Sequence, residues 1–473
     1  MADLNVDICV IGAGSGGLNV AAGASQMGAS VVLVEKAKMG GDCLNTGCVP
    51  SKALLAAAHA AAAVRGGGQF GVNSGELSVD GGRVFEHVRD VIAAIEPNDS
   101  VERFEGLGVR VIQAAASFTG PRTLEAGGQQ ITARRFVVAT GSSAFVPPIP
   151  GLDSVAYHTN ETIFDCTSLP GHLIIVGGGP IGMEMAQAHR RLGTKVTVLE
   201  LFSIMPKDDP ELVDVLRRQL EDDGIDIREG VTISRIEKSN SGVSVVLGGD
   251  GVEVSVEGSH LLIAAGRRPS VDGLGLDEAG VRYSAKGIEV DGRLRTSNKK
   301  IFAIGDVAGG FQFTHVAGYH AGIVIKNALF RLPSKVDNRV VPWVTYTTPE
   351  LAQVGMVEAE AKKTHGDIRV LRWPFHENDR AQAEALTDGL IKVITTPKGH
   401  VLGCGIVGPA AGELIHTWVL AMSQKIKIGA IAQMIAPYPT LGEVSKRAAG
   451  SFYTPSLFSE RTRKIVKFLS RFG

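Results

Sequence analysis

The chain reads VDICVIGAGSGGLNVAAGASQMGASVVLVE from Val6 to Glu35 and LIIVGGGPIGMEMAQAHRRLGTKVTVLE from Leu173 to Glu200. An offset of 165 positions aligns Gly12 with Gly177 and brings the two terminal glutamates into register. Each copy has an apolar segment, a G-x-G-x-x-G loop, a segment rich in small residues and a β-branched segment that ends in Glu. The order strand, loop, helix, strand, repeated in this way, predicts an α/β fold with two Rossmann-like domains.

The glycine spacing indicates nucleotide binding. The first Gly makes a tight turn, the second lets the backbone approach a pyrophosphate, and the third lets the helix pack on the strand. The helix N-terminus offers free N–H groups to the anion, and the acidic residue accepts hydrogen bonds from ribose hydroxyls. One such loop is a weak signal, but two copies in register predict two dinucleotide sites. Their candidate residues are Gly12, Gly14, Gly17 and Glu35 in the first copy and Gly177, Gly179, Gly182 and Glu200 in the second.

Two dinucleotide sites in one chain suggest a flavin that stays bound and a nicotinamide that exchanges, which together form an electron-transfer pair. Glu200 favours NADH over NADPH, because a carboxylate repels the 2′-phosphate that an Arg would bind. The next residues, Leu201 to Lys207, contain no Arg. We therefore expect FAD and NADH as cofactors.

Composition excludes several other classes. The 473 residues hold 48 Lys and Arg against 49 Asp and Glu, so a net charge of −1 leaves no electrostatic footprint for nucleic acid. With 44% hydrophobic and 21% charged residues, wholesale disorder is not expected, and the length suggests about three domains. Ile8 to Val34 is a stretch of 27 uncharged residues, but six are Gly, so a nucleotide-binding strand–loop–helix–strand explains it better than a membrane span.

The N-terminus has no basic region, so we expect no secretory signal. Five cysteines in a chain of this length do not make a disulfide scaffold. These features favour a soluble, cytoplasmic protein with little membrane contact.

Two of the cysteines lie close together, in GGDCLNTGCVPSK from Gly40 to Lys52. The Ala-rich segment that follows is helix-prone, and a helix that starts within the motif would lower a thiol pKa through its dipole, as would Lys52. A zinc site would need more Cys or His nearby, so we expect no metal. Two inert buried thiols are the other alternative, and the local chemistry favours a redox function for Cys43 and Cys48.

This motif resembles the signature of the class I pyridine nucleotide–disulfide oxidoreductases, the family of dihydrolipoamide dehydrogenase, glutathione reductase and mercuric reductase. The resemblance covers nearly the whole chain. Similar family motifs are Ala139-Thr140-Gly141, Ala264-Ala265-Gly266-Arg267-Arg268-Pro269, Thr296 with Ile301-Phe302-Ala303-Ile304-Gly305-Asp306, and Tyr346-Thr347-Thr348-Pro349-Glu350-Leu351-Ala352.

The resemblance implies a role for each matching position. Cys43 would be the interchange thiol that meets substrate, and Cys48 the charge-transfer thiolate against the flavin. Lys52 and Glu184 would form the ion pair beside the flavin N5, although Glu184 taken alone reads as a solvated helix residue. The remaining cofactor-binding positions would be Thr140, Gly141, Asp306 near the ribityl–phosphate region, and Gly266.

The family pattern breaks near the C-terminus. The disulfide reductases carry a His before Pro-Thr and a Glu five residues after it, and this His, from the partner subunit, is the acid/base. Here Tyr438 holds the His position, while Glu443 aligns. Tyr titrates near 10 and is a poor thiol base at neutral pH, where a positioned base contributes ~10²–10⁴-fold. His315 and His320 are possible substitutes, but structural roles are favoured for both.

Mercuric reductases also carry a Tyr in this neighbourhood but add a C-terminal Cys pair. The last cysteine here is Cys404, so we do not expect efficient Hg²⁺ reduction. The acceptor stays open: a disulfide is the default, a metal ion (Hg or Cu) or quinone is the alternative, and a low-turnover flavin redox sensor is the other class.

The resemblance implies a homodimer and three domains. These are an FAD-binding domain over 1–150, completed by about 271–340, an NAD-binding domain over 151–270, and an α+β interface domain over 341–473. The tail from Arg461 to Arg471 is basic and amphipathic. It could rest on a membrane surface, but a helix packed on the protein is favoured.

Overall fold

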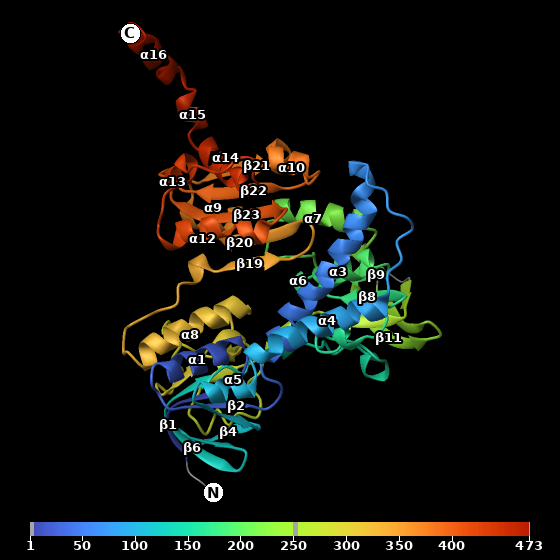
Figure 1. Cartoon of the computed structure of the whole chain (residues 1–473), viewed down its shortest axis with the longest axis vertical. Helices are drawn as coiled ribbons and strands as arrows, with labels where there is room; N and C mark the ends of the chain where they lie inside the picture. Colours follow the sequence, from blue (N-terminus) through green and yellow to red (C-terminus); the bar gives the residue numbers. More distant parts are fainter. Residues whose placement is uncertain (1–3, 249–253, 473) are drawn as a thin grey trace. The chain divides into compact units, whose positions relative to one another are not determined.

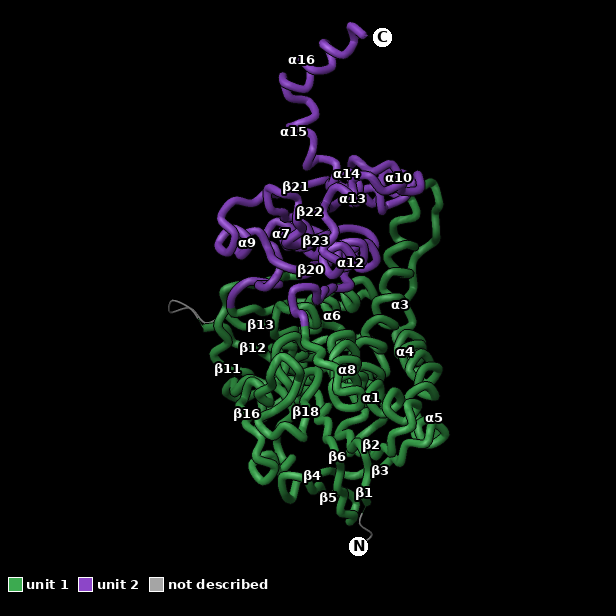
Figure 2. The backbone as a smooth tube through the Cα atoms, turned by 90° about the vertical axis from the view of Figure 1, so that its left-hand side faces the viewer, with its two compact units in different colours: residues 1–201, 226–336 green, residues 202–225, 337–473 purple. Residues whose placement is uncertain are grey.

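The computed structural model describes residues 4–248 and 254–472. The chain divides into two compact units, coloured separately in Figure 2. Unit 1 comprises residues 1–201 and 226–336, and unit 2 comprises residues 202–225 and 337–473.

A seven-stranded sheet forms the first half of unit 1, in the order β3-β2-β1-β6-β5-β4 with β18 also paired to β6. The parallel strands are β1 (Leu4–Ile11), β2 (Val31–Glu35), β3 (Val109–Gln113), β6 (Gln129–Val138) and β18 (Ile301–Ala303). Two antiparallel strands, β5 (Thr123–Ala126) and β4 (Ala116–Gly120), complete it.

Helices α1 (Ser15–Gln26) and α8 (Thr314–Ala328) lie side by side against this sheet, as Figure 1 shows. The strands between such layers are buried on both faces and are therefore continuously apolar. The core under α1 and α8 includes Val10, Leu33 and Val137, all fully buried. The uncharged stretch of the sequence thus forms β1, a loop, α1 and β2, as predicted.

The second sheet of unit 1 is entirely parallel, in the order β10-β9-β8-β14. Its strands are β8 (His172–Val176), β9 (Lys195–Leu199), β10 (Asp226–Arg228) and β14 (His260–Ile263), and α6 (Pro180–Arg191) connects β8 to β9. Pro180 opens α6, where its missing N–H costs nothing. A three-stranded antiparallel sheet packs against this parallel sheet, and the two share a hydrophobic core. Its strands are β11 (Thr232–Ser239), β12 (Gly242–Gly248) and β13 (Val254–Gly258).

The two cysteines of the motif lie on neighbouring helices of unit 1. Cys43 lies in α2 (Gly41–Asn45), and α3 (Cys48–Gly66) packs against both α4 (Gly81–Ile95) and α6. By length and composition the segment Gly41–Phe70 could cross a membrane, with 39% of its apolar window buried, but a core helix passes the same test. Further elements of unit 1 are α5 (Val101–Gly106), β7 (Ser142–Ala144), β15 (Arg267–Pro269), β16 (Tyr283–Ser284) and β17 (Gly287–Ile288).

Unit 2 is built on an antiparallel five-stranded sheet in the order β19-β20-β23-β22-β21. The strands are β19 (Pro342–Thr345), β20 (Glu350–Gly355), β21 (Arg369–Pro374), β22 (Leu390–Thr395) and β23 (Val401–Gly408). Its core centres on the fully buried Trp418 and Phe375. The helices are α7 (Pro210–Asp222), α9 (Glu358–His365), α10 (Asp379–Ala383), α11 (Ala411–Leu414), α12 (His416–Ser423), α13 (Ile428–Gln433) and α14 (Glu443–Ser451).

A buried lysine fastens α7 to the sheet of unit 2. Lys392 on β22 is 4% exposed, and its Nζ lies 2.9 Å from Asp209, 2.8 Å from Glu211 and 2.7 Å from Glu358. Arg372 also pairs with Glu211 at 2.7 Å. The three carboxylates thus compensate the positive charges of Lys392 and the neighbouring Arg372, as a buried cation requires.

The chain ends in two helices, α15 (Thr454–Leu457) and α16 (Glu460–Leu469). Of the described residues in these helices, none is buried, and Figures 1 and 2 show the segment extending away from the sheet of unit 2. The expectation that this tail packs on the protein is therefore wrong.

Candidate active site

The first glycine loop forms a cradle between β1 and α1. Gly12 has φ +103°, and a Cβ there would collide with the carbonyl of Ala139. A Cβ at Gly17 would collide with the carbonyl of Gly12, so only glycine fits either position. The Glu35 carboxylate accepts a hydrogen bond from the backbone N–H of Ala13 at 2.6 Å. The terminal glutamate is thereby held at the loop.

The second glycine loop repeats this construction. Gly177 has φ +116° and lies against the carbonyl of Ala264, and Gly182 lies against the carbonyl of Gly177. The Glu200 carboxylate accepts the backbone N–H of Gly178 at 2.6 Å. The sequence repeat is therefore also a repeat of hydrogen bonds and of steric constraints.

Both loops fit the diphosphate of a dinucleotide. Gly14 and Gly179 cap α1 and α6, and neither cap provides a side-chain hydrogen bond to the first turn, which also lacks acidic residues. Among the described residues, no heavy atom lies within 4 Å of a Cβ built on either glycine, apart from its chain neighbours and its own helix. The free N–H groups and the positive end of each helix dipole thus face open space that an anion can enter.

The other predicted cofactor positions lie in turns at the ends of strands. Gly141 (φ +67°) and Gly266 (φ +121°) take left-handed backbone conformations that glycine favours. The Thr140 hydroxyl donates to the carbonyl of Ser270 at 2.8 Å. Asp306, in a short helical turn after β18, accepts a hydrogen bond from Ser142 at 2.6 Å, and burial raises its pKa.

The cysteine motif rests directly on the first glycine loop. The N–H of Gly40 donates to the carbonyl of Ala13 at 3.0 Å. A Cβ on Gly41 would come within 2.7 Å of the Cα of Gly14. The first turn of α2, which carries Cys43, is therefore placed by backbone contact with the cradle.

Both cysteines of the motif are free thiols in the structure, with Cys48 exposed and Cys43 partly exposed. A hydrogen bond from Cys43 lowers the pKa of Cys48 to about 6, helped by Thr314 and the charge of Lys52 and opposed by partial desolvation of the sulfur, although the residue as a whole is exposed. The same hydrogen bond, together with burial, raises the pKa of Cys43. Cys48 is also the first residue of α3, so the condition set for a dipole effect on this thiol, a helix that begins within the motif, is met. At neutral pH the pair holds one thiolate and one thiol.

Lys52 and Glu184 form an ion pair with Nζ and Oε2 2.7 Å apart. The Glu184 side chain is 6% exposed and the Lys52 side chain 37%. Glu184 is therefore not a solvated helix residue. The pair joins α3 to α6 and thus links the cysteine motif to the helix of the second cradle.

Sequence reasoning missed a polar network around the motif. Arg267 donates to the Ser142 hydroxyl at 2.8 Å and lies 3.2 Å from Asp42 and 3.9 Å from Asp306. Asn160 donates to Asp42 at 2.9 Å. Arg267 stood inside a quoted family motif, but nothing in the sequence signals that it meets Asp42.

Thr314 was also missed, although it opens the Thr-His-Val-Ala-Gly-Tyr-His segment. Its Oγ1 lies 3.3 Å from the sulfur of Cys48 at the start of α8. His320 in the same helix is buried, accepts the N–H of Gly305 at 3.2 Å, and has a pKa lowered by burial to about 4. It is a neutral structural histidine. His315 stacks on Phe313 with ring centroids 5.3 Å apart.

Tyr438 and Glu443 belong to unit 2, whereas the other predicted site residues belong to unit 1. The Tyr438 hydroxyl donates to Asp379 at 2.8 Å, and its side chain is 70% exposed. This hydrogen bond and the Asp379 charge raise the tyrosine pKa above its usual value. Glu443 is the first residue of α14. Within the described residues, no cluster of three His, Cys, Asp or Glu could hold a metal ion.

Two dinucleotide cradles joined through a dithiol define an enzyme that moves electrons between nucleotide and sulfur. Residues 6–321 match the family model of the pyridine nucleotide–disulphide oxidoreductases, and residues 341–449 match the model of their dimerisation domain. The chain belongs to this family. It is an FAD-dependent, NAD(P)H-linked oxidoreductase of the α/β class that acts on sulfur groups and forms a homodimer.

Its relatives include two kinds of enzyme. A dihydrolipoyl dehydrogenase of Thermus scotoductus is 35% identical, over 95% of this chain and 98% of its own length. A mercuric reductase of Bacillus cereus is 34% identical, over 94% of this chain and 71% of its own length. A solved structure, the Cu(II) complex of the HOCl-induced flavoprotein disulfide reductase RclA from Escherichia coli, has a TM-score of 0.85 and 28% identity, over 94% and 99% of the two chains.

Proposed function

We propose that the enzyme passes reducing equivalents from NADH to the Cys43–Cys48 disulfide and from there to a small acceptor. The first cradle would hold FAD and the second NADH. The carboxylate of Glu200, held on the N–H of Gly178, supports NADH, because a 2′-phosphate would meet its negative charge. Bound FAD would supply the carrier that accepts hydride and delivers electron pairs.

We propose the same three domains that the family resemblance implies, and strand pairing supports them. Residues 1–150 would form the FAD domain with 271–340, supported by β18, which pairs with β6. Residues 151–270 would form the NAD domain, supported by the β8–β14 pairing, except that 202–225 group with unit 2, and 341–473 would form the interface domain. Tyr438 and Glu443 of the partner subunit would complete each active site. The enzyme would work in the cytoplasm, where its nucleotide substrate is found.

Each cysteine has a separate task. Reduction of the disulfide breaks the S–S bond and takes up two electrons and, at neutral pH, one proton. Cys48 stays ionised because Cys43, Thr314 and Lys52 stabilise its thiolate, and Cys43 retains the proton. Cys43, on the short helix α2, would be the thiol that meets the acceptor. The Lys52–Glu184 pair would fix a positive charge beside the redox centre.

The side chain at position 438 decides the class of acceptor. Attack of Cys43 on a disulfide acceptor such as lipoamide needs a base that takes the thiol proton, and the Tyr438 hydroxyl, bonded to Asp379 with a raised pKa, is itself protonated at neutral pH. A thiophilic metal ion needs no such positioned base, because binding to the sulfurs displaces the Cys43 proton to solvent before the electrons pass to the metal. We propose Cu(II) as the acceptor, supported by the copper complex of RclA. The balance is NADH plus two Cu(II) to NAD⁺, two Cu(I) and one proton, with the Cys43–Cys48 bond re-formed.

A panel of acceptors tests this proposal. Purified holoenzyme with NADH is assayed with Cu(II), Hg²⁺, lipoamide, glutathione disulfide and a quinone, and Cu(I) is measured with a chelating dye. We expect Cu(II) to give the fastest turnover and Cys43→Ser to abolish it. Faster lipoamide turnover near neutral pH, or copper reduction that survives in the variant, would contradict the proposed acceptor. Fast reduction of the flavin with no acceptor that re-oxidises it would favour a redox sensor.

A further inference from the structure

The C-terminal helix α16 presents an apolar face that the rest of unit 2 leaves uncovered. Phe468 is 55% exposed, Leu469 57% and Val466 60%. Ser459 caps the helix by accepting the N–H of Thr462 at 3.2 Å, so its start is well defined. A helix of ten residues without packing partners is marginal in water, since most helical stability comes from burial of an amphipathic face. This helix therefore needs a surface to rest on.

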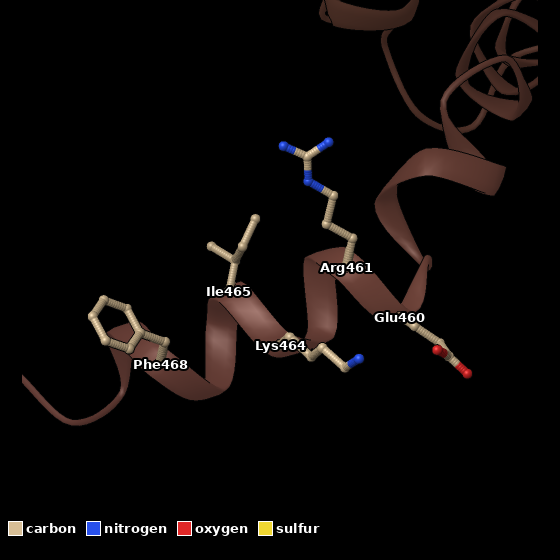
Figure 3. A pocket seen from close by; sticks show the side chains of 5 residues that line it. All are labelled: Glu460, Arg461, Lys464, Ile465 and Phe468. Carbon is tan, nitrogen blue, oxygen red and sulfur yellow. The ribbon is translucent and has the colours of Figure 1, made fainter.

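The polar and apolar residues of α16 lie on separate faces. At about 100° per residue, the apolar side chains span an arc of roughly 160°. The opposite arc holds most of the basic side chains, and Figure 3 shows Ile465 and Lys464 leaving the helix on different sides. The side chains of Glu460, Arg461, Lys464, Ile465 and Phe468 border a shallow hollow that is largely open to solvent.

The charge of the tail indicates which kind of surface α16 would bind. The whole chain is nearly neutral, with a net charge of −1. Residues 460–472 nevertheless hold five basic residues against one acidic residue, Glu460. A basic amphipathic helix with Phe and Leu on its apolar face is typical of helices that lie in the interface of an anionic bilayer. The basic residues are Arg461, Arg463, Lys464, Lys467 and Arg471.

Helix α16 lies outside the segment that matches the family's dimerisation domain. The matched dimerisation domain ends at residue 449, before α15 begins. A second copy of the chain could cover the apolar face, but it would leave the basic side chains on the opposite arc without an anionic partner. An anionic lipid surface offers acyl chains to the apolar face of α16 and phosphates to its basic side chains.

We propose that α16 binds the enzyme peripherally to an anionic lipid bilayer. The side chains of Ile465, Phe468 and Leu469 enter the boundary between headgroups and acyl chains, and Lys464 and Lys467 meet lipid phosphates. Two copies of the helix in the homodimer strengthen the binding through avidity. This proposal replaces the expectation of little membrane contact, and it does not depend on which acceptor the enzyme reduces.

Vesicle flotation of the full-length holoenzyme tests the proposal. Wild type is mixed with vesicles of phosphatidylcholine alone or with added phosphatidylglycerol, and bound enzyme is measured from its flavin. We expect binding to the anionic vesicles only, weakened by salt. The double substitution Phe468→Ser with Leu469→Ser removes the apolar face. Lys464→Glu with Lys467→Glu reverses two charges, and each double variant should bind at least about 10-fold more weakly.

Phe70→Ser is the matched control, because Phe70 is 56% exposed and lies outside the tail. It should bind like wild type, and all variants should keep their flavin and its reduction by NADH. Wild type that fails to bind anionic vesicles, or binds both vesicle types equally, overturns the proposal. If the apolar double variant instead changes the oligomeric mass in light scattering and wild type ignores vesicles, the face belongs to a second copy and the proposal is wrong.

Discussion

The hydroxyl of Thr314 offers a direct test of how the fold sets the reactivity of the dithiol. Thr314→Val keeps the shape of the side chain but removes the group that lies 3.3 Å from the Cys48 sulfur. A hydrogen bond to a charged group contributes ~1.5–3 kcal/mol, and a long bond to sulfur belongs at the low end. Since 1.36 kcal/mol corresponds to one pKa unit, the Cys48 pKa should rise by about one unit.

The wild-type pKa of about 6 makes Cys48 largely thiolate at pH 7. In the variant the thiolate fraction at pH 7 should fall from about nine-tenths to about one-half. The assay is the pH dependence of alkylation by iodoacetamide in the reduced holoenzyme, with peptide mapping to separate Cys48 from Cys43. The Cys48 rate should rise with pH through about 6 in wild type and through about 7 in the variant.

Thr314→Ser is the control, because it keeps a hydroxyl at the same position. It should retain a midpoint close to that of wild type. An unchanged midpoint in Thr314→Val, or an equal shift in both variants, would show that the hydroxyl does not stabilise the thiolate.

Three further substitutions test other parts of the argument. Glu200→Arg should move the ratio of kcat/KM toward NADPH by at least about tenfold, because it replaces repulsion of the 2′-phosphate with attraction; an unchanged ratio would remove Glu200 from the ribose site. Tyr438→His should raise dihydrolipoamide oxidation by up to ~10²-fold, with Asp379 orienting the imidazole; robust lipoamide activity in wild type would contradict this reasoning. Lys392→Met should lower the free energy of unfolding by about 3 kcal/mol, because three carboxylates lose their cation; denaturant unfolding that matches wild type would show that the cluster is not stabilising.

Local patterns predicted the parts of the site that are close in sequence. The glycine spacing fixed both cradles, because each depends on residues within one strand–loop–helix unit. The helix after the motif followed from the Ala-rich segment, but that segment did not show that the helix begins at Cys48. The family membership rests on these same motifs.

Contacts between distant segments could not be predicted in this way. Arg267 reaches Asp42, and Thr314 reaches Cys48, across more than two hundred residues of chain. Neither pair leaves a periodic or compositional signal. The expectation that the tail packs on the protein failed for a related reason. The sequence pattern shows an apolar face, but whether other residues cover that face depends on the fold around it.

The contact between Gly41 and Gly14 couples the proposed FAD site to the position of the cysteine pair. The backbone that would clasp the diphosphate is the same backbone that carries the turn leading to Cys43. A substitution that displaces the first glycine loop should therefore disturb the diphosphate site and the placement of Cys43 together.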